Sequence, residues 1–488
     1  MNDFLIKRRT LILNSLVIPL LRPFKLAHGE NLSPTQSTPR LPTRGSWKWD
    51  TVLWDADRRR LGSIGREFFR LKDKSLVLRL DSHNEQGYNS DTYTSDIVTF
   101  TLRSTDAGFT WHKYDGPLHE ENQTRLSDGT LFKVFAGGAV TLEERRALLA
   151  KVGANPQTAS REGNDLWPES KRSELEKQGF AVDAGFPGTI GTLTVLSTSR
   201  STDGGKTFDY QVISGLPHLA RIFGSFRRVI ELRNGTLLAA GFAKRKTSTP
   251  HFSFVIRSTN RGRTWEFFPV AEDPSGRLDF NEMEIYQLPN GKILAMVRTA
   301  DTGTDGIRES SAGVGTNLFQ SFSDDGGAHW TPYERTPIWG APPQLIMLKS
   351  GKLLCTYAHR RHPYGVRSCL SHDLGKTWDY ENEKIIRDDS LPGLVDYPTS
   401  TQLDDGTILT AYTISKIPRI PYRPDDQVVP NNDLLIHRRQ RTGKDAHWYG
   451  GYHAIAGLSR YTENYVRTPG QVTSRTMWDT DTFNDDNN

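Results

Sequence analysis

An octapeptide that recurs five times constrains this chain more than any other feature. Its pattern is Ser-x-Asp-x-Gly-x-x-Trp, and the copies begin at Ser104, Ser201, Ser258, Ser323 and Ser371. Phe208 replaces the Trp in the second copy, and Asn260 replaces the Asp in the third. An Asp or Asn side chain can bond nearby backbone N–H groups in a turn, and glycine supplies a positive φ. We therefore expect each copy to be a structural turn between two strands, with the aromatic side chain packed beneath it.

A second repeat lies upstream of these turns and reads as an apolar strand, a bend and another strand. Its six copies begin near residues 68, 124, 229, 285, 345 and 400. The chain also contains 11 Trp and 22 Phe against five Met, which favours strands over helices. Six such units predict an all-β fold, a six-bladed β-propeller. Because the sixth unit lacks an octapeptide, a seventh blade built from residues 440–488 or 46–60 is the open alternative.

Residues 1–30 have the pattern of an export leader. A basic segment at 7–9 precedes an apolar run at 11–21, which is too short to span a bilayer. The two arginines resemble a twin-arginine signal, although the usual Phe and a small-residue cleavage site are absent. An ordinary secretory signal or an uncleaved anchor would also fit. Residues 31–45 read as a linker, and 46–488 as the propeller of an exported protein, either periplasmic or extracellular.

Residues 141–180 break the repeat pattern. They contain LEERRALLAKVG and SELEKQG, whose periodicity and charge pairs are typical of helices. We expect a helical insertion in the second blade, either as a surface decoration or as a lid or wall of the site.

The charge pattern limits the classes of partner. The net charge of +5 permits an acidic ligand, but the basic residues are scattered rather than gathered in a stripe, which argues against nucleic-acid binding. No metal-binding spacing such as H-E-x-x-H and no nucleotide-binding fingerprint is present, so we expect no cofactor. The sequence predicts a monomer without a membrane span.

The octapeptides resemble the Asp boxes of the sialidase (neuraminidase) superfamily, also known for its BNR repeats, over roughly residues 60–440. The resemblance implies an exo-glycosidase that releases a terminal acidic sugar from a glycan or glycoconjugate with retention. In that family three arginines hold the sugar carboxylate, a tyrosine paired with a glutamate is the nucleophile, and an aspartate is the general acid/base. The boxes are specific for the fold only, since lyases, rhamnosidases and non-enzymatic propellers also carry them.

The resemblance implies roles for four residues in the second half of the chain. Glu282, in the segment FNEMEIY, stands where the family has its catalytic base, and Arg298 follows 16 residues later at the position of an arginine of the clamp. Arg367 precedes the fifth octapeptide, where another clamp arginine is expected. Tyr397 opens the sixth unit at the position of the nucleophile. Glu284 is the alternative base, because alternate residues of a strand share a face.

The first half of the chain matches the family pattern less closely. Arg66 is the candidate for the remaining clamp arginine, two residues from the expected position but on the same strand face. Asp91 is the candidate acid/base, with Asp96 and Asp81 as alternatives. These departures leave room for another acidic sugar, such as a uronic acid.

Two other functions remain open. A propeller lyase acting on uronic-acid glycans would use histidine and tyrosine, and His83, His359 and His362 lie in suitable polar segments. A non-catalytic glycan-binding propeller would need none of these groups.

Cys355 and Cys369 fall on adjacent strands of the fifth unit. They could form a cross-strand disulfide or remain buried free thiols.

Overall fold

The structure is a computed structural model of the chain. It describes residues 48–55, 60–61, 68–83, 98–114, 124–137, 167–168, 170, 173, 177, 181–184, 189–217, 219, 221–223, 228–246, 249–301, 317–361, 363–390, 395–416 and 453–466. Within these ranges no helix is long and apolar enough to cross a bilayer.

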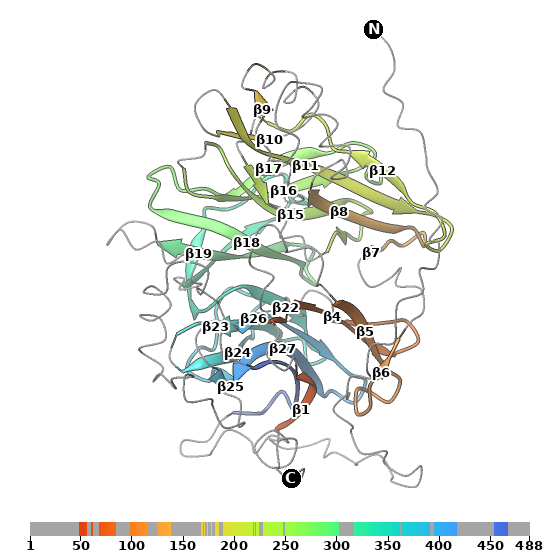
Figure 1. Cartoon of the computed structure of the whole chain (residues 1–488). Helices are drawn as coiled ribbons and strands as arrows, with labels where there is room; N and C mark the ends of the chain where they lie inside the picture. Colours follow the sequence, from red (N-terminus) through yellow and green to blue (C-terminus); the bar gives the residue numbers. More distant parts are fainter. Residues whose placement is uncertain are drawn as a thin grey trace, which may run out of the picture. The chain divides into compact units, whose positions relative to one another are not determined.

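The described strands form six antiparallel sheets, the blades of a β-propeller (Figure 1). Blade one contains β2 (Arg60–Leu61), β3 (Phe68–Arg70), β4 (Leu76–His83), β5 (Val98–Ser104) and β6 (His112–Lys113). Blade two contains β7 (Thr124–Arg125), β8 (Leu131–Gly137), β9 (Trp167–Pro168), β10 (Ala181–Ala184), β11 (Thr189–Ser201) and β12 (Asp209–Val212). Blade three contains β13 (Arg221–Phe223), β14 (Ile230–Glu231), β15 (Leu237–Lys244), β16 (Phe252–Ser258) and β17 (Glu266–Ala271).

The last three blades have four strands each. Blade four contains β18 (Leu278–Gln287), β19 (Ile293–Asp301), β20 (Asn317–Ser323) and β21 (Glu334–Trp339). Blade five contains β22 (Pro343–Met347), β23 (Leu353–His359), β24 (Tyr364–Ser371) and β25 (Lys384–Ser390). Blade six contains β26 (Val395–Gln402), β27 (Ile408–Lys416), β28 (His453–Tyr461) and β1 (Lys48–Asp55).

Blade six is closed by the strand that comes first in the chain. β1 pairs with β28 from Lys48 opposite Tyr461 to Asp55 opposite Ile455, and Figure 1 shows the red β1 beside the blue strands of this blade. The segments considered for a seventh blade thus complete the sixth. This also explains why the sixth unit has no octapeptide, because its third and fourth strands come from opposite parts of the chain.

The hydrophobic core lies between neighbouring blades. Leu238 of blade three packs with Phe280 and Ile285 of blade four in one cluster. Leu294 of blade four packs with Tyr357 of blade five in the next. Each fully buried side chain of this kind contributes about 1.5–3 kcal/mol to folding, so the stability of a blade depends on its neighbours.

The octapeptides form the predicted turns. In the first copy Asp106 Oδ1 accepts a hydrogen bond from Thr110 N (2.9 Å), and Ser104 Oγ accepts one from Gly108 N (2.7 Å). Gly108 has a φ of 82°, and the Trp111 indole donates to its carbonyl (3.0 Å). Glycine is also required for space, because a Cβ at Gly262 of the third copy would lie 2.5 Å from the Phe132 ring of the preceding blade.

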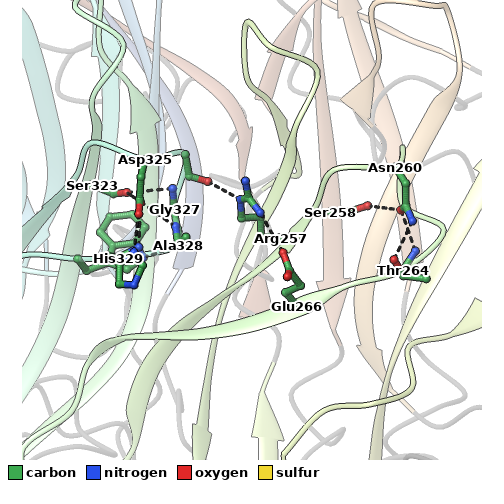
Figure 2. A network of polar contacts seen from close by, with 12 residues as sticks. Arg257, Ser258, Asn260, Thr264, Glu266, Ser323, Asp325, Gly327, Ala328 and His329 are labelled. Carbon is green, nitrogen blue, oxygen red and sulfur yellow. Dashed lines mark hydrogen bonds and ion pairs between the residues drawn. The ribbon is translucent and has the colours of Figure 1, made fainter.

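Arginine side chains join one turn to the next blade, a feature that the repeat pattern did not predict. Figure 2 shows Arg257 of blade three, whose Nε donates to the carbonyl of Gly326 in the blade-four turn (3.1 Å) and whose Nη1 bonds Glu266 (2.9 Å). Arg460 of blade six donates in the same way to the carbonyl of Ala107 in blade one (2.8 Å). These bonds tie blade three to blade four and blade six to blade one.

The predicted insertion at 141–180 lies mostly outside the described residues. Ser173 and Lys177 are helical, whereas Trp167 and Pro168 pair with β11 as a short strand.

The two cysteines are free thiols. Cys355 and Cys369 lie directly opposite each other on β23 and β24, and both are buried. Burial, together with the nearby Glu383 carboxylate, raises the pKa of Cys369 to about 12, so its thiol stays protonated. Of the two alternatives, the structure has the thiols.

Candidate functional site

Topology brings the predicted site residues of blades four to six to one end of the propeller. In these blades the first and second strands meet at tight bends, such as the Leu288–Lys292 bend, on the same end as the octapeptide turns. The opposite end carries the start of the first strand, the end of the second and the start of the third. Glu282, Arg298, Arg367 and Tyr397 lie toward that opposite end, which we call the site end.

Glu282 lies in a β-bulge of β18. The register of β18 against β19 shifts between Phe280 and Met283, so Asn281 and Glu282 are left opposite Arg298. Bulges redirect side chains and are frequent near active sites. Here the bulge brings Glu282 Oε2 to 2.6 Å from Arg298 Nη1, with both side chains close to nine-tenths buried. Within the described part of the chain, Glu282 is the one ion-pair or hydrogen-bond partner of Arg298.

Tyr397 lies in the matching bulge of blade six. The register of β26 against β27 shifts between Asp396 and Thr399, which leaves Tyr397 and Pro398 unpaired with β27. Tyr397 has a φ of 35° and is buried, with 8% of its surface exposed. A non-glycine residue in this left-handed region costs on the order of 1–3 kcal/mol and persists where its surroundings hold it, often at a functional site.

A chain of polar contacts ties the β18 bulge to the loop before β16. His251 Nδ1 donates to Asp279 Oδ2 (2.7 Å), and Asn281 Nδ2 donates to Asp279 Oδ1 (2.9 Å). Asn281 Oδ1 in turn accepts from the backbone N–H of Glu282 (2.7 Å). Although burial opposes ionisation, the hydrogen bond from His251 keeps the pKa of Asp279 below its ordinary value. The result is an oriented His–Asp pair within three residues of Glu282.

Arg367 is engaged by a different carboxylate. Its Nη1 lies 2.6 Å from Glu383 Oε2, next to the outermost strand of blade five, and its Nη2 bonds the carbonyl of Pro363 (3.5 Å). Glu383 also accepts a hydrogen bond from the buried Tyr357 hydroxyl. Among the described contacts, none joins Arg367 to Glu282, Arg298 or Tyr397. The structure therefore brings Glu282 and Arg298 together and places Arg367 in a separate network.

The remaining candidates are described less fully. Arg66, Asp91, Asp96 and His362 lie outside the described residues. Asp81 lies on β4 opposite Thr99, and His83 lies at the end of the same strand. Glu284, the alternative base, is half-buried and lies opposite Met296. In the described ranges no group of three or more His, Cys, Asp or Glu side chains is arranged to hold a metal ion.

The partners that orient the site were not among the residues predicted from the sequence. Asp279 and Asn281 lie beside Glu282, and these two polar residues at alternate positions of the strand are a visible signal. Glu383 follows Arg367 by 16 residues, the same separation that joins Glu282 to Arg298. His251 precedes an apolar strand and had no sequence signal of its own.

These features define a class, a six-bladed propeller of repeated turns with an ionic site at one end. The family model described as a BNR repeat-like domain matches residues 180–410. Residues 180–410 are therefore similar to BNR repeats, the repeat class that the octapeptides predict.

No protein with a curated description matches the chain. Among solved structures it is similar to a protein of unknown function from Dyadobacter fermentans, with 19% identity and a TM-score of 0.54, over 87% of this chain and 100% of that one. It is also similar to a Hadza microbial sialidase (18% identity, TM-score 0.42, 72% of this chain and 63% of that one). A third is the Trypanosoma rangeli sialidase in complex with sialic acid (12%, 0.42, 85% and 59%). At these identities the likeness concerns the fold alone.

Proposed function

We propose that the protein is a glycosidase that releases a terminal acidic sugar with retention of configuration. The observation that carries the proposal is the pair of matching bulges at the site end. One presents Glu282 with Arg298 in blade four, and the other holds Tyr397 at a positive φ in blade six. These are the residue types that a tyrosine-based glycosidase requires.

Each residue has a chemical role in the proposal. Tyr397 Oη attacks the anomeric carbon, and Glu282 accepts its proton, so that a neutral group approaches an anionic sugar. The N–H groups of Arg298 that Glu282 does not use bind the sugar carboxylate. From the sequence alone, Arg66 adds to this clamp and Asp91 protonates the leaving oxygen. Arg367 is the less suitable clamp arginine, because Glu383 and the Pro363 carbonyl bond its Nη1 and Nη2 and its Nε is buried.

A fluorogenic sialoside tests the proposal, with and without an unsaturated sialic acid analogue that mimics the transition state. We expect hydrolysis that the analogue blocks, and a loss of kcat of at least about a thousand-fold in Tyr397→Phe. Tyr461→Phe is the control, because Tyr461 is a buried tyrosine of the same blade whose hydroxyl contacts Thr410. Turnover that survives in Tyr397→Phe would exclude the nucleophile, and no turnover by folded wild-type protein would exclude sialic acid as the substrate.

Export by the leader at residues 1–30 is part of the proposal and rests on its sequence pattern. Fractionation of cells that express the full chain tests it, with the two leader arginines changed to lysine. Retention of that variant in the cytoplasm would support the twin-arginine route, and its normal export would exclude it.

A further inference from the structure

One arginine at the site end carries a charge that no described carboxylate balances. Arg361 lies in the short connection between β23 and β24, and its side chain is exposed. Arg298 and Arg367 each contact a carboxylate at 2.6 Å. The contacts of Arg361 in the described part of the molecule are to a histidine and an indole.

Two contacts hold the Arg361 guanidinium in one orientation. Its Nε donates to His359 Nε2 (3.2 Å), and its plane lies over the Trp339 ring, 4.4 Å from the ring centre. The edge of the His359 ring meets the same indole at 5.4 Å. Both contacts leave the Nη1 and Nη2 groups available, and these two nitrogens form the edge that binds a carboxylate through two parallel hydrogen bonds.

The protonation state of His359 keeps this hydrogen bond in place at neutral pH. Its Nδ1 donates to the carbonyl of Pro363 (3.0 Å), so a neutral ring has its lone pair on Nε2, facing Arg361. Burial and the nearby Arg367 lower the pKa of His359 to about 4. The imidazole therefore accepts the Arg361 hydrogen bond throughout the physiological range.

The connection that carries Arg361 also touches the strand of Tyr397. Arg360, its neighbour, donates from Nε to the carbonyl of Val395 (3.0 Å), two residues before Tyr397 on β26. The Pro363 carbonyl that His359 bonds is shared with Arg367 Nη2. Arg361 is thus linked on one side to blade six and on the other to Trp339 at the end of blade four.

We propose that Arg361 and Trp339 form a binding site for the carboxylate of an acidic sugar, with His359 as the positioning residue. This inference rests on the proposed function, which takes an acidic sugar as the substrate. It adds an oriented arginine that has no carboxylate partner among the described residues, whereas the buried Arg367 is paired with Glu383. The ligand class is a uronic or sialic acid, whose carboxylate pairs with the Nη edge.

Binding by ligand-observed NMR tests the site without requiring turnover. The probes are glucuronic acid and N-acetylneuraminic acid, each compared with its neutral methyl ester, at pH 7. We expect the acids to bind more tightly than the esters and Arg361→Gln to weaken binding of the acids about ten- to a hundred-fold. His359→Phe should weaken it by less, since the guanidinium is kept but its orientation is lost.

Arg263→Gln is the matched control, because Arg263 is an exposed arginine in an octapeptide turn at the opposite end. It should leave binding unchanged. Acid and ester that bind wild-type protein equally, no binding by wild-type protein, or an Arg361→Gln variant that binds the acids normally would each overturn the inference.

The same proteins, assayed with the fluorogenic sialoside, separate this inference from the proposed function. Acid-selective binding that depends on Arg361, without hydrolysis, would support the site and count against the sialidase. Hydrolysis with an unchanged KM in Arg361→Gln would support the glycosidase and overturn the site.

Discussion

Blade four and blade five each contain one arginine–glutamate pair with the same geometry and different surroundings. In both, the two residues are 16 positions apart, and Nη1 meets Oε2 at 2.6 Å. Burial does not separate them, since all four side chains are between 8% and 13% exposed. The difference lies in the other partners. Glu383 is also bonded by the Tyr357 hydroxyl, and Arg367 by the Pro363 carbonyl, whereas Arg298 has Glu282 alone in the described part of the chain.

The comparison separates the two pairs by their remaining partners and by the burial of their unused donors. In blade five Tyr357 and Pro363 also bond the pair, and the one Arg367 nitrogen without a hydrogen-bond partner, Nε, is buried. In blade four the Nε and Nη2 groups of Arg298 have no hydrogen-bond partner among the described residues and are not fully buried, so they are available to a ligand. The distance between the charges does not distinguish the two cases.

The largest effect on stability is expected from breaking the blade-five pair. Glu383→Ala leaves the Arg367 charge buried without a partner and removes the acceptor of Tyr357, so it should lower the free energy of unfolding by about 3–5 kcal/mol. Urea denaturation measures the loss. The double variant Arg367→Met with Glu383→Leu should recover most of it, because no unpaired charge is left. A double variant as unstable as the single one would mean that the pair itself stabilises the blade.

The next largest effect on stability is expected from the titration of His359. Its Nδ1 and Arg367 Nη2 both bond the Pro363 carbonyl. Its pKa is lowered to about 4 in the folded protein, so between the unfolded value near 6.5 and about 4 the unfolded chain binds more protons. Stability should therefore fall as the pH falls through this window, by up to about 3 kcal/mol, and should be fully present above it.

Urea titrations at a series of pH values measure this dependence. His359→Gln should remove that part of the pH dependence and leave the part due to carboxylates. A variant with the wild-type slope would assign the dependence to other groups.

Breaking the blade-four pair should affect activity more than breaking the blade-five pair. Glu282→Ala leaves the Arg298 charge without its described carboxylate, so it should lower the free energy of unfolding by about 3 kcal/mol. Its effect on hydrolysis should be larger than that of Glu383→Ala once both are assayed well below their melting temperatures. Equal effects on hydrolysis in the two variants would remove the distinction drawn between the pairs.

The smallest effect on stability is expected from removing the Tyr357 hydroxyl, which bonds Glu383. Tyr357→Phe keeps the packing and removes the hydroxyl that bonds Glu383, which should cost about 1 kcal/mol. Burial raises the pKa of Tyr357 well above its ordinary value, so the hydroxyl stays a donor at every pH of interest. Thermal denaturation of the variant measures the effect, and a stability equal to that of wild type would show that Glu383 needs only Arg367.

The propeller could be predicted because its turn chemistry is local. Each octapeptide holds the Ser, Asp and Gly that bond one another within eight residues, so the repeat is readable without any long-range information. The closing of blade six was left open for the opposite reason. Asp50 and Ser459 bond each other across 409 positions, and nothing local in either segment specifies the pairing.

The part of the site that lies within one hairpin could be predicted from the sequence. Glu282 and Arg298 face each other across β18 and β19, so their spacing was informative. The bulges that aim Glu282 and Tyr397 depend on a register shift, which strand alternation does not reveal. The partner of Arg367 could not be found, because a buried, paired arginine and a ligand-binding arginine have the same spacing to the next turn.

The order of synthesis determines when blade six, and with it the proposed site, can be completed. β1 is made first among the described strands and has to wait, unpaired, until residues 453–461 leave the ribosome, since β28 is its only neighbour in the sheet. Arg387 of blade five then finds Asp50 of β1 at 3.0 Å, both fully enclosed, and this contact pins the closed ring. The five earlier blades can assemble as they emerge, but the blade that carries Tyr397 is completed last. A nascent chain that stalls before β28 would hold a nearly complete propeller with an open edge and an unfinished site.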